Sequence, residues 1–398
     1  MYRRIRKLPL HVAILHPSMH FLGGAERLMT DLALGLADRE TRVDLIAGLC
    51  HATWKSELCA NASVSVREVG QRSPGSLEFW LSVRGCAKAL RRLIDPDTNV
   101  IVTSSFPSSL AARMFTQEHD AKVVHYLHEA PMVLHDKDGV KALPFPLKSF
   151  YRMMSALYAK DDIEAVTESD TIIANSRLTR EANSKAYAID QSRIELIYPG
   201  VNTERMAPSG FVPTLIADYV KEGIPIVFTP KGAQFWRNPQ ICLQALTKLV
   251  FPFRAVFTGG TRNEGDSLLK RARALGIAES VLWTQELSTQ ELSGLYSHSA
   301  VVVSVPKRQP FGLIPLEALM HGAPPIVSSS SGVSEVLRDQ VDAIRINEGN
   351  PEDLANALQA LISDDEMRRG IVSSGRGTIL KRLTLTRFVN EMREKIFT

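Results

Sequence analysis

The sequence alternates throughout between short segments rich in valine and isoleucine and longer amphipathic segments. Twelve of the short segments have the length of β-strands: residues 10–15, 42–47, 99–103, 122–127, 170–174, 194–197, 224–229, 253–258, 279–283, 300–305, 324–327 and 342–346. Each is followed by apolar residues at helical spacing, a pattern typical of parallel strands buried on both faces. The sequence therefore predicts an α/β fold with doubly wound sheets.

The strand-helix units fall into two series, which predicts two domains. A chain of 398 residues also exceeds what one ordinary core organises. The first series ends at Pro199-Gly200-Val201-Asn202. We expect an N-terminal domain over residues 1–205 and a C-terminal domain over 206–380, with a last helix over 381–398 that packs back toward the first domain. Ligands of such sheets bind beyond the carboxyl ends of the strands.

Composition excludes several classes of protein. Hydrophobic residues make up 44% and charged residues 23%, as in soluble globular proteins, and no apolar run is long enough to cross a bilayer. The net charge of +4 favours an anionic ligand or membrane surface, and we expect no nucleic-acid partner. Four cysteines without a metal-binding spacing suggest free thiols in a reducing compartment. The segment 8–15 fits a first strand better than a signal peptide. We expect a cytoplasmic protein, with peripheral contact to an anionic membrane as an open alternative.

The stretch after strand 300–305 predicts a nucleotide-phosphate site. Gln309 lies in the loop, Gly312 and Leu313 open a helix, and Glu317 lies within that helix. Free backbone amides at a helix start favour an anion. Glu317 can accept hydrogen bonds from vicinal hydroxyls such as those of a ribose.

Two further loops carry candidate ligand contacts. Gly23 and Gly24 follow the first strand and open a helix, either as a phosphate or sugar site or as a plain turn. Lys231 and Arg237 follow strand 224–229 and can stabilise a diphosphate, or are solvated loop cations. His128 closes strand 122–127, where it is either a ligand contact or a structural histidine.

These motifs resemble the E-x7-E motif and glycine loop of the retaining GT-B glycosyltransferases of family 4, and the resemblance spans nearly the whole chain. It includes Gly-Gly-Ala-Glu at 23–26, Asn175-Ser176 and the Tyr198 to Asn202 seam. It implies two Rossmann-like domains facing a central cleft, with a nucleoside diphosphate sugar in the second domain and the acceptor in the first. The early loop and the seam are most similar to the lipid-linked-oligosaccharide α-mannosyltransferases of this family.

The resemblance also implies roles for single residues. The catalytic set is His128, Lys231, Arg237 and Gln309, and the donor-binding set is Gly23, Gly24, Phe311, Gly312, Leu313 and Glu317. Glu335 either bonds the sugar or a neighbouring loop, or caps its own helix. The chain departs from the family at Gln309, where an amide replaces the first glutamate, and at Lys231, which is one residue from the family position.

The implied reaction moves a mannose- or glucose-type sugar to an acceptor hydroxyl with retention of configuration and without a cofactor or metal. The D-x-D sequences at 95–97 and 136–138 lie in loops of the first half and are not expected to bind a catalytic metal. The alternatives are a nucleotide-sugar epimerase or phosphorylase on the same fold, or a catalytically weak binding scaffold, for which Gln309 is the motive.

The segment 144–160 bears on the acceptor. Its apolar residues have helical spacing, which indicates a stripe facing the core: Leu147, Phe150, Tyr151, Met154, Leu157 and Tyr158. Lys141, Lys148, Arg152 and Lys160, with Phe145, instead suit a helix on an anionic lipid surface, and the basic residues 3–7 would add to that attraction. Because enzymes of the family it resembles often act on lipid-linked acceptors, a lipid-linked or glycan acceptor is the expectation, with the core-facing stripe as the alternative for this segment.

Overall fold

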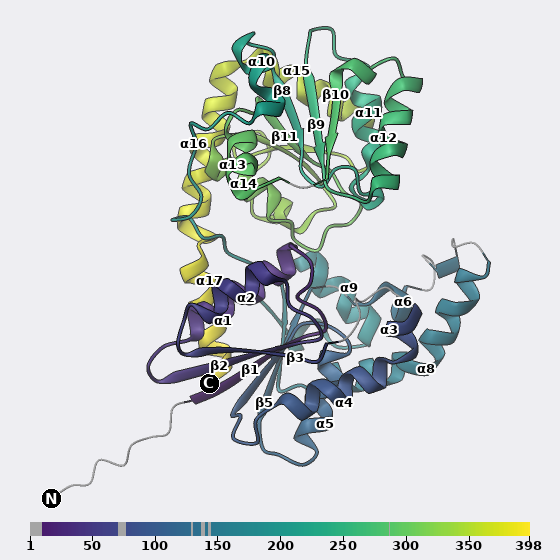
Figure 1. Cartoon of the computed structure of the whole chain (residues 1–398), viewed down its shortest axis with the longest axis vertical. Helices are drawn as coiled ribbons and strands as arrows, with labels where there is room; N and C mark the ends of the chain where they lie inside the picture. The colour runs from purple at the N-terminus through teal and green to yellow at the C-terminus, as the bar shows by residue number, and fades with distance from the viewer. Residues whose placement is uncertain (1–9, 71–76, 129, 137–139, 142–144, 286) are drawn as a thin grey trace, which may run out of the picture. The chain divides into compact units, whose positions relative to one another are not determined.

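The chain forms two compact units (Figure 1). The computed structural model describes residues 10–70, 77–128, 130–136, 140–141, 145–285 and 287–398. The first unit comprises residues 1–198 and 386–398, and the second comprises residues 199–385. Residues 199–205, which the sequence analysis placed in the first domain, thus belong to the second unit. Each unit has one sheet with helices on both faces, so the predicted doubly wound α/β architecture is confirmed.

The first unit contains a seven-stranded parallel sheet with the order β3-β2-β1-β4-β5-β6-β7. Its strands are β1 (Leu10–His16), β2 (Thr41–Ala47), β3 (Val64–Glu68), β4 (Val100–Thr103), β5 (Lys122–Leu127), β6 (Thr171–Ala174) and β7 (Ile194–Leu196). The strand order reverses between β1 and β4. Doubly wound sheets bind ligands at such a reversal, beyond the carboxyl ends of the strands.

All strands predicted in the first half are present, but β3 was missed. It is an edge strand, and after the buried Val64 its remaining residues are only partly covered. Its sequence, VSVRE, therefore lacks the continuous apolar run on which the prediction relied.

The helices of the first unit cover both faces of its sheet. They are α1 (Gly24–Leu36), α2 (Ala52–Cys59), α3 (Leu77–Leu81), α4 (Val83–Leu93), α5 (Ser108–Thr116), α6 (Met132–His135), α8 (Leu147–Thr167) and α9 (Arg177–Tyr187). Ala13 and Leu15 of β1 share a core with residues of α3, α4, α5 and α8, including Met154 and Tyr158. This packing confirms a core-facing side of α8 but limits it, because Leu147 and Leu157 of the expected stripe are exposed.

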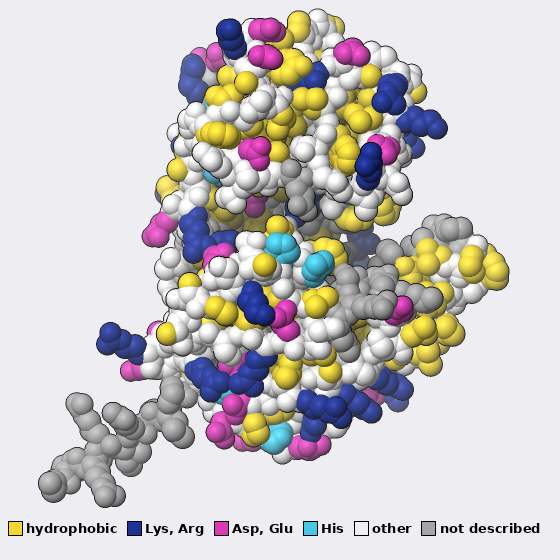
Figure 2. Space-filling view, viewed as in Figure 1, with side chains coloured by type: hydrophobic (Ala, Val, Ile, Leu, Met, Phe, Trp, Pro, Cys, Tyr) yellow, Lys and Arg dark blue, Asp and Glu magenta, His cyan; other side chains and the backbone are white. Residues whose placement is uncertain are grey.

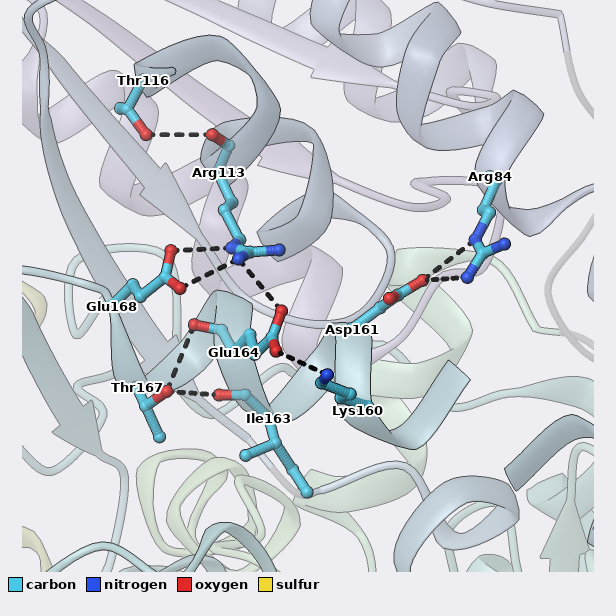
Figure 3. A network of polar contacts seen from close by, with 9 residues as sticks. All are labelled: Arg84, Arg113, Thr116, Lys160, Asp161, Ile163, Glu164, Thr167 and Glu168. Atoms are coloured by element: carbon cyan, nitrogen blue, oxygen red, sulfur yellow. Dashed lines mark hydrogen bonds and ion pairs between the residues drawn. The ribbon is translucent and has the colours of Figure 1, made fainter. Parts of the chain in front are cut away.

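Ion pairs join the outer parts of α4, α5 and α8 (Figure 3). Arg84 of α4 lies 2.9 Å from Asp161 of α8, and Arg113 of α5 contacts both Glu164 and Glu168. Partly exposed pairs of this kind contribute at most about 1 kcal/mol each. They occupy Asp161 and Glu164 in the second half of α8, and Lys160 of the same helix also pairs with Glu164.

The last helix of the chain, α17 (Leu385–Phe397), packs in the first unit. Phe388 is fully buried and meets the ring of Tyr126 on β5 edge to face, with 5.7 Å between ring centroids. Arg393 pairs with Asp38 at 3.1 Å, and Lys395 pairs with Glu195 at 2.7 Å. Helix α17 thus buries its apolar side in this unit, and two ion pairs hold its polar side.

The second unit has a six-stranded parallel sheet with the order β10-β9-β8-β11-β12-β13. Its strands are β8 (Ile226–Thr229), β9 (Arg254–Thr258), β10 (Val281–Thr284), β11 (Val301–Ser304), β12 (Pro325–Ser328) and β13 (Ile344–Ile346). Its helices are α10 (Ala217–Lys221), α11 (Pro239–Leu246), α12 (Arg262–Ala274), α13 (Thr289–Ser297), α14 (Ile314–His321), α15 (Pro351–Ser363) and α16 (Asp365–Arg382). All strands predicted in this half are present. The order reverses between β8 and β11.

The chain passes from one unit to the other twice, and the two passages are hydrogen-bonded to each other. Val201 and Thr384 form a parallel bridge, in which the Val201 amide donates to Leu383 O and the Leu385 amide donates to Val201 O, both at 2.9 Å. A Cβ on Gly200 would lie 2.2 Å from Thr384 O, so only glycine allows this close approach of the two backbones.

Candidate functional site

The loops after β8 and β11 bring together two of the predicted catalytic residues. Arg237 follows β8 and Gln309 follows β11, at the point where the strand order reverses. Nη1 of Arg237 donates a hydrogen bond of 3.0 Å to Oε1 of Gln309. Parallel sheets of this kind present ligand-binding groups at this position.

The loop after β8 is held by backbone geometry that few sequences allow. Lys231 has a φ of 54°, and its amide donates to Thr258 Oγ1 at 3.0 Å. Gly232 has no room for a side chain, because a Cβ would lie 2.2 Å from Cγ2 of Thr229. Asn238 has a φ of 59° and donates from Nδ2 to Val305 O at 3.0 Å, which ties the Arg237 loop to the end of β11. Lys231 and Arg237 thus lie in one loop whose backbone conformation is fixed by these contacts.

The loop after β11 is fixed against the serine-rich segment 328–334. Gln309 forms a parallel bridge with Ser331, and the Val333 amide donates to Phe311 O at 2.9 Å. Phe311 is buried. Gly312 has a φ of 100°, where glycine is favoured, and Leu313 is the N-cap of α14. The backbone of Gly312 and Leu313 therefore places the N-terminus of α14 next to Gln309.

Glu317 lies in the first turn of α14 and is held by a tyrosine that the sequence analysis did not identify. The Tyr296 hydroxyl donates to Glu317 Oε2 at 2.8 Å. Tyr296 is buried on α13 and stacks on His321, with 5.4 Å between the ring centroids. Because its partner is 21 residues away on another helix, no local motif points to Tyr296. Burial raises the Tyr296 pKa well above its usual value, so it stays a donor.

The electrostatics of this site centre on Arg237. Burial lowers the pKa of its guanidinium, while the charges of Tyr296 and Glu317 act in the opposite direction. Its Nε is buried without a hydrogen-bond partner among the residues that the structure describes. Buried charges are normally paired. The cation of this site, Arg237, therefore has the neutral amide of Gln309 as its hydrogen-bonded partner. This arrangement is suited to an anionic ligand.

Glu335 ends the short 3₁₀ helix Gly332–Glu335, directly after the serine-rich segment that pairs with Gln309. Ser334 O and Leu337 O on either side of it accept from Nη2 of Arg345, at 2.7 and 3.2 Å. Glu335 is half-buried and is engaged in an interaction of its own. Its role in sugar binding stays a prediction.

The glycine loop of the first unit follows β1 at the reversal of that sheet. Gly23 is the N-cap of α1, with extended backbone, and Gly24 is its first residue. A Cβ on Gly23 would lie 2.2 Å from Oε2 of Glu26, so the carboxylate folds back over this glycine. The loop therefore offers backbone amides beside an acidic side chain, and its ligand role stays a prediction.

His128 lies one residue beyond β5 and is half-buried. Burial lowers its pKa to about 3, and the charges of His16 and His125 act in the same direction. Its Nε2 atom is buried and finds no hydrogen-bond partner within the described part of the chain. A neutral imidazole of this kind can donate or accept a hydrogen bond but does not supply positive charge.

The remaining sequence candidates are the two D-x-D sequences, at residues 95–97 and 136–138. Asp97 N donates to Asp95 Oδ1 at 3.1 Å, in a turn just beyond α4. The second D-x-D falls partly outside the described residues, which omit 137–139. Across the described ranges, no group of three or more His, Cys, Asp or Glu side chains is placed to hold a metal ion.

Two family models match consecutive parts of the chain. Residues 22–205 match the family described as Glycosyltransferase Family 4, and residues 216–378 match Glycosyl transferases group 1. The chain is similar to the D-inositol 3-phosphate glycosyltransferase of Xylanimonas cellulosilytica, with 22% identity over 393 residues that cover 94% of this chain and 91% of the relative. The enzyme of the same name from Rhodococcus erythropolis is 26% identical over 353 residues, covering 85% and 72%.

A solved structure shares the fold. The Anabaena protein HepE, in complex with UDP and glucose, aligns with a TM-score of 0.77 at 17% identity, over 97% of this chain and 99% of that one. The likeness, together with the two sheets, identifies the fold as GT-B. The chain belongs to the group 1 glycosyltransferases of the family 4 type.

Proposed function

We propose that the protein transfers a sugar from a nucleoside diphosphate sugar to an acceptor hydroxyl. The observation that carries the proposal is the half-buried Arg237 guanidinium, hydrogen-bonded to Gln309 where the second sheet reverses its strand order. A guanidinium whose hydrogen-bonded partner is a neutral amide is suited to a diphosphate, because its planar donors match phosphate oxygens.

The second unit would hold the donor by complementary contacts. Arg237 and Lys231 stabilise the diphosphate, together with the amides around Gly312 and Leu313. Glu317, positioned by Tyr296, accepts hydrogen bonds from two vicinal hydroxyls of the nucleoside. Support for this ligand class comes from the similar fold of HepE, which has been solved with UDP and glucose.

We propose that transfer retains the anomeric configuration and moves a glucose- or mannose-type sugar. The bond between the anomeric carbon and the diphosphate oxygen breaks, the acceptor oxygen bonds to the same face of that carbon, and the acceptor proton passes to the leaving diphosphate. Arg237 stabilises the negative charge that develops on the leaving group. The reaction needs no metal in this scheme, so we expect full activity in excess EDTA.

The acceptor belongs to the first unit in this proposal. His128 would hydrogen-bond a ligand hydroxyl, a role supported by its neutral ring and by a buried Nε2 without a partner among the described residues. Two acceptor classes fit. The named relatives act, by their names, on D-inositol 3-phosphate. A lipid-linked acceptor is favoured by the surface of α8.

That surface combines exposed apolar and basic side chains (Figure 2). Phe145 is 81% exposed and Leu81 is 60% exposed. Met153, Leu157 and Arg152 of α8 are exposed as well. Contiguous apolar patches rimmed by cations are typical of contact with anionic lipid. No helix among those described is long and apolar enough to cross a bilayer. We therefore propose peripheral contact of this surface with an anionic membrane.

Vesicle sedimentation tests the contact. The double variant Lys148→Glu/Arg152→Glu should bind phosphatidylglycerol vesicles at least about tenfold more weakly, since each lost cation costs about 1 kcal/mol. The double variant Met153→Ser/Leu157→Ser should weaken binding by at least about tenfold as well, because two apolar side chains no longer enter the lipid. The matched controls Leu275→Ser and Lys270→Glu change exposed residues of the second unit. Equal binding of all proteins, or no binding by the wild type, would overturn the membrane contact without touching the transfer reaction.

A panel of nucleotide sugars tests the reaction itself. The protein should release nucleoside diphosphate only when a donor and an acceptor are both present, and nuclear magnetic resonance of the product should show the donor's anomeric configuration. An epimerase would convert the donor without releasing nucleoside diphosphate. Nucleotide binding without turnover of any donor would favour a catalytically weak binding scaffold, the alternative that the neutral side chain of Gln309 suggests.

A further inference from the structure

A groove of about 630 Å³ runs along one side of α16 in the second unit. One wall is a stripe on that helix which includes Arg368, Arg369, Arg376 and Gly377. The other wall is formed by residues just before β11 and β12, such as Ala300. The volume is within the range of small-molecule sites. A second hollow of about 530 Å³ shares Ala300 and Arg368 with it.

The groove is separate from the donor site. It lies at the amino ends of β11 and β12, whereas Arg237 and Gln309 follow the carboxyl ends of β8 and β11. A parallel sheet keeps these two edges apart by the length of its strands. Neither the reaction proposed above nor the family motifs use any residue of this groove.

The charges on the groove are unbalanced. Three guanidinium groups line it, with Asp365 as the single carboxylate. Asp365 pairs with Arg368, whose Nη1 also donates to Leu361 O and Ile362 O at 2.7 Å. Arg376 donates from Nη2 to Met320 O at 2.8 Å and has no carboxylate partner in the described chain. Arg369 is exposed and has no hydrogen-bond or ion-pair partner among the described residues.

The neighbouring cations also repel each other. Burial, and then the charge of Arg369, lowers the pKa of the Arg368 guanidinium. Because the carbonyls of Leu361 and Ile362 hold Arg368 in place, it cannot swing away from this repulsion. An anion bound to Arg369 would relieve it.

Gly377 keeps the groove open. A glycine inside a helix costs about 1 kcal/mol relative to alanine. On the same helix Gly375 has a packing reason, because a Cβ there would lie 2.6 Å from Cδ2 of Leu319. At Gly377 a Cβ would meet nothing within 4 Å. Packing within the second unit therefore does not require this glycine, and a larger side chain here would take up space in the groove that Gly377 lines.

We propose that this groove binds a small phosphorylated molecule. Its phosphate is held by the guanidinium groups of Arg369 and Arg376, whose planar donors fit phosphate oxygens. Its organic part contacts Val372 and the exposed Leu380, which continue the same wall. The single carboxylate, already paired with Arg368, leaves this end of the groove positively charged.

Calorimetric titration with inorganic phosphate and glucose 6-phosphate, with glucose as the uncharged control, tests the proposal on the full chain. Both anions should bind at millimolar concentrations and glucose should not. Arg369→Ala should weaken the binding at least about tenfold, whereas Arg382→Ala on the same helix, outside the groove, should leave it unchanged. Gly377→Leu should fill the groove and abolish binding, whereas Gly370→Leu, at an exposed glycine of α16 outside the groove, should not.

The Arg237→Ala variant separates this groove from the donor site. Phosphate binding that persists in Arg237→Ala but is lost in Arg369→Ala supports the groove. Binding lost in Arg237→Ala and retained in Arg369→Ala would place the anion in the donor site and overturn the proposal. Absence of any anion binding, or equal binding by all groove variants, would overturn it as well. None of these outcomes depends on sugar transfer.

Discussion

Arg237 and Gln309 lie 72 residues apart in the sequence and are joined by a hydrogen bond of 3.0 Å at the ends of two adjacent strands. A glutamate at position 309 would neutralise the arginine, whereas the amide does not. The Arg237 charge is therefore left to the ligand, and the sugar side of the site has no carboxylate from this residue.

The substitution Gln309→Glu tests what that missing charge does. We expect kcat to rise by about tenfold, because a carboxylate near a sugar that develops positive charge is worth roughly 1.4 kcal/mol or more at short range. Steady-state kinetics with the preferred donor measures the effect, and Gln309→Asn controls for altered packing. An unchanged or lower kcat would mean that the amide is not a deficit in this protein.

Replacing Arg237 by lysine should lower kcat/KM by about 10²-fold. Lysine keeps the charge but loses the planar donors that bond Gln309 and match phosphate oxygens. The matched control is Lys270→Ala, at an exposed cation of α12 in the same unit. Activity of Arg237→Lys within a factor of about two of the wild type would show that only the charge matters.

The substitution Tyr296→Phe should raise KM for the donor about fivefold and leave kcat nearly unchanged, since a hydrogen bond to a charged group contributes at least about 1 kcal/mol. The phenol acts by positioning Glu317 and does not touch the reacting atoms in our scheme. Tyr219→Phe, at a half-buried tyrosine of the same unit, provides the control. A fall in kcat at constant KM would contradict a positioning role.

Two buried histidines of the first unit should make its stability depend on pH. Burial lowers the pKa of His16 to about 4 and that of His125 to about 3, from 6.5 in both cases. Between pH 6.5 and about 4.5 the unfolded chain therefore binds more protons than the folded chain, and the free energy of unfolding falls as pH falls. Each histidine contributes up to about 1.4 kcal/mol per pH unit.

Urea unfolding across that pH window measures the effect. His16→Asn and His125→Asn should each reduce the slope of stability against pH relative to the wild type. The window lies above the range in which buried carboxylates such as Asp44 protonate, because the pKa of Asp44 is lowered. Equal slopes in all variants would show that these histidines are not neutral in the fold.

The sequence was sufficient for most of the architecture, because parallel buried strands leave an apolar run that can be read without knowledge of their neighbours. β3 escaped because it is a partly covered edge strand. The helical character of the first part of α8 also followed from its periodicity, but its extent to Thr167 and its outward side did not. Exposure of Leu147 and Leu157 depends on where the helix meets α4 and α5, which local spacing does not encode.

The donor residues could be named from motif order, but their contacts could not. Nothing local indicates that Asn238 bonds Val305 O, or that Tyr296 reaches Glu317 from another helix. The first contact arises because the sheet places the ends of β8 and β11 side by side, and the second because α13 and α14 pack against each other. The sequence was sufficient to name the candidate side chains, whereas the fold determines which of them are fixed by hydrogen bonds.

The paired passages at Val201 and Thr384 have a consequence for protease resistance. Because the polypeptide runs between the units twice, a single cut near residue 200 or residue 385 leaves one covalent tie intact. The cut end would also remain held by the backbone hydrogen bonds of Val201 to Leu383 and Leu385. Separating the two halves would therefore require two cleavages, and a preparation nicked once should still migrate as one particle under native conditions.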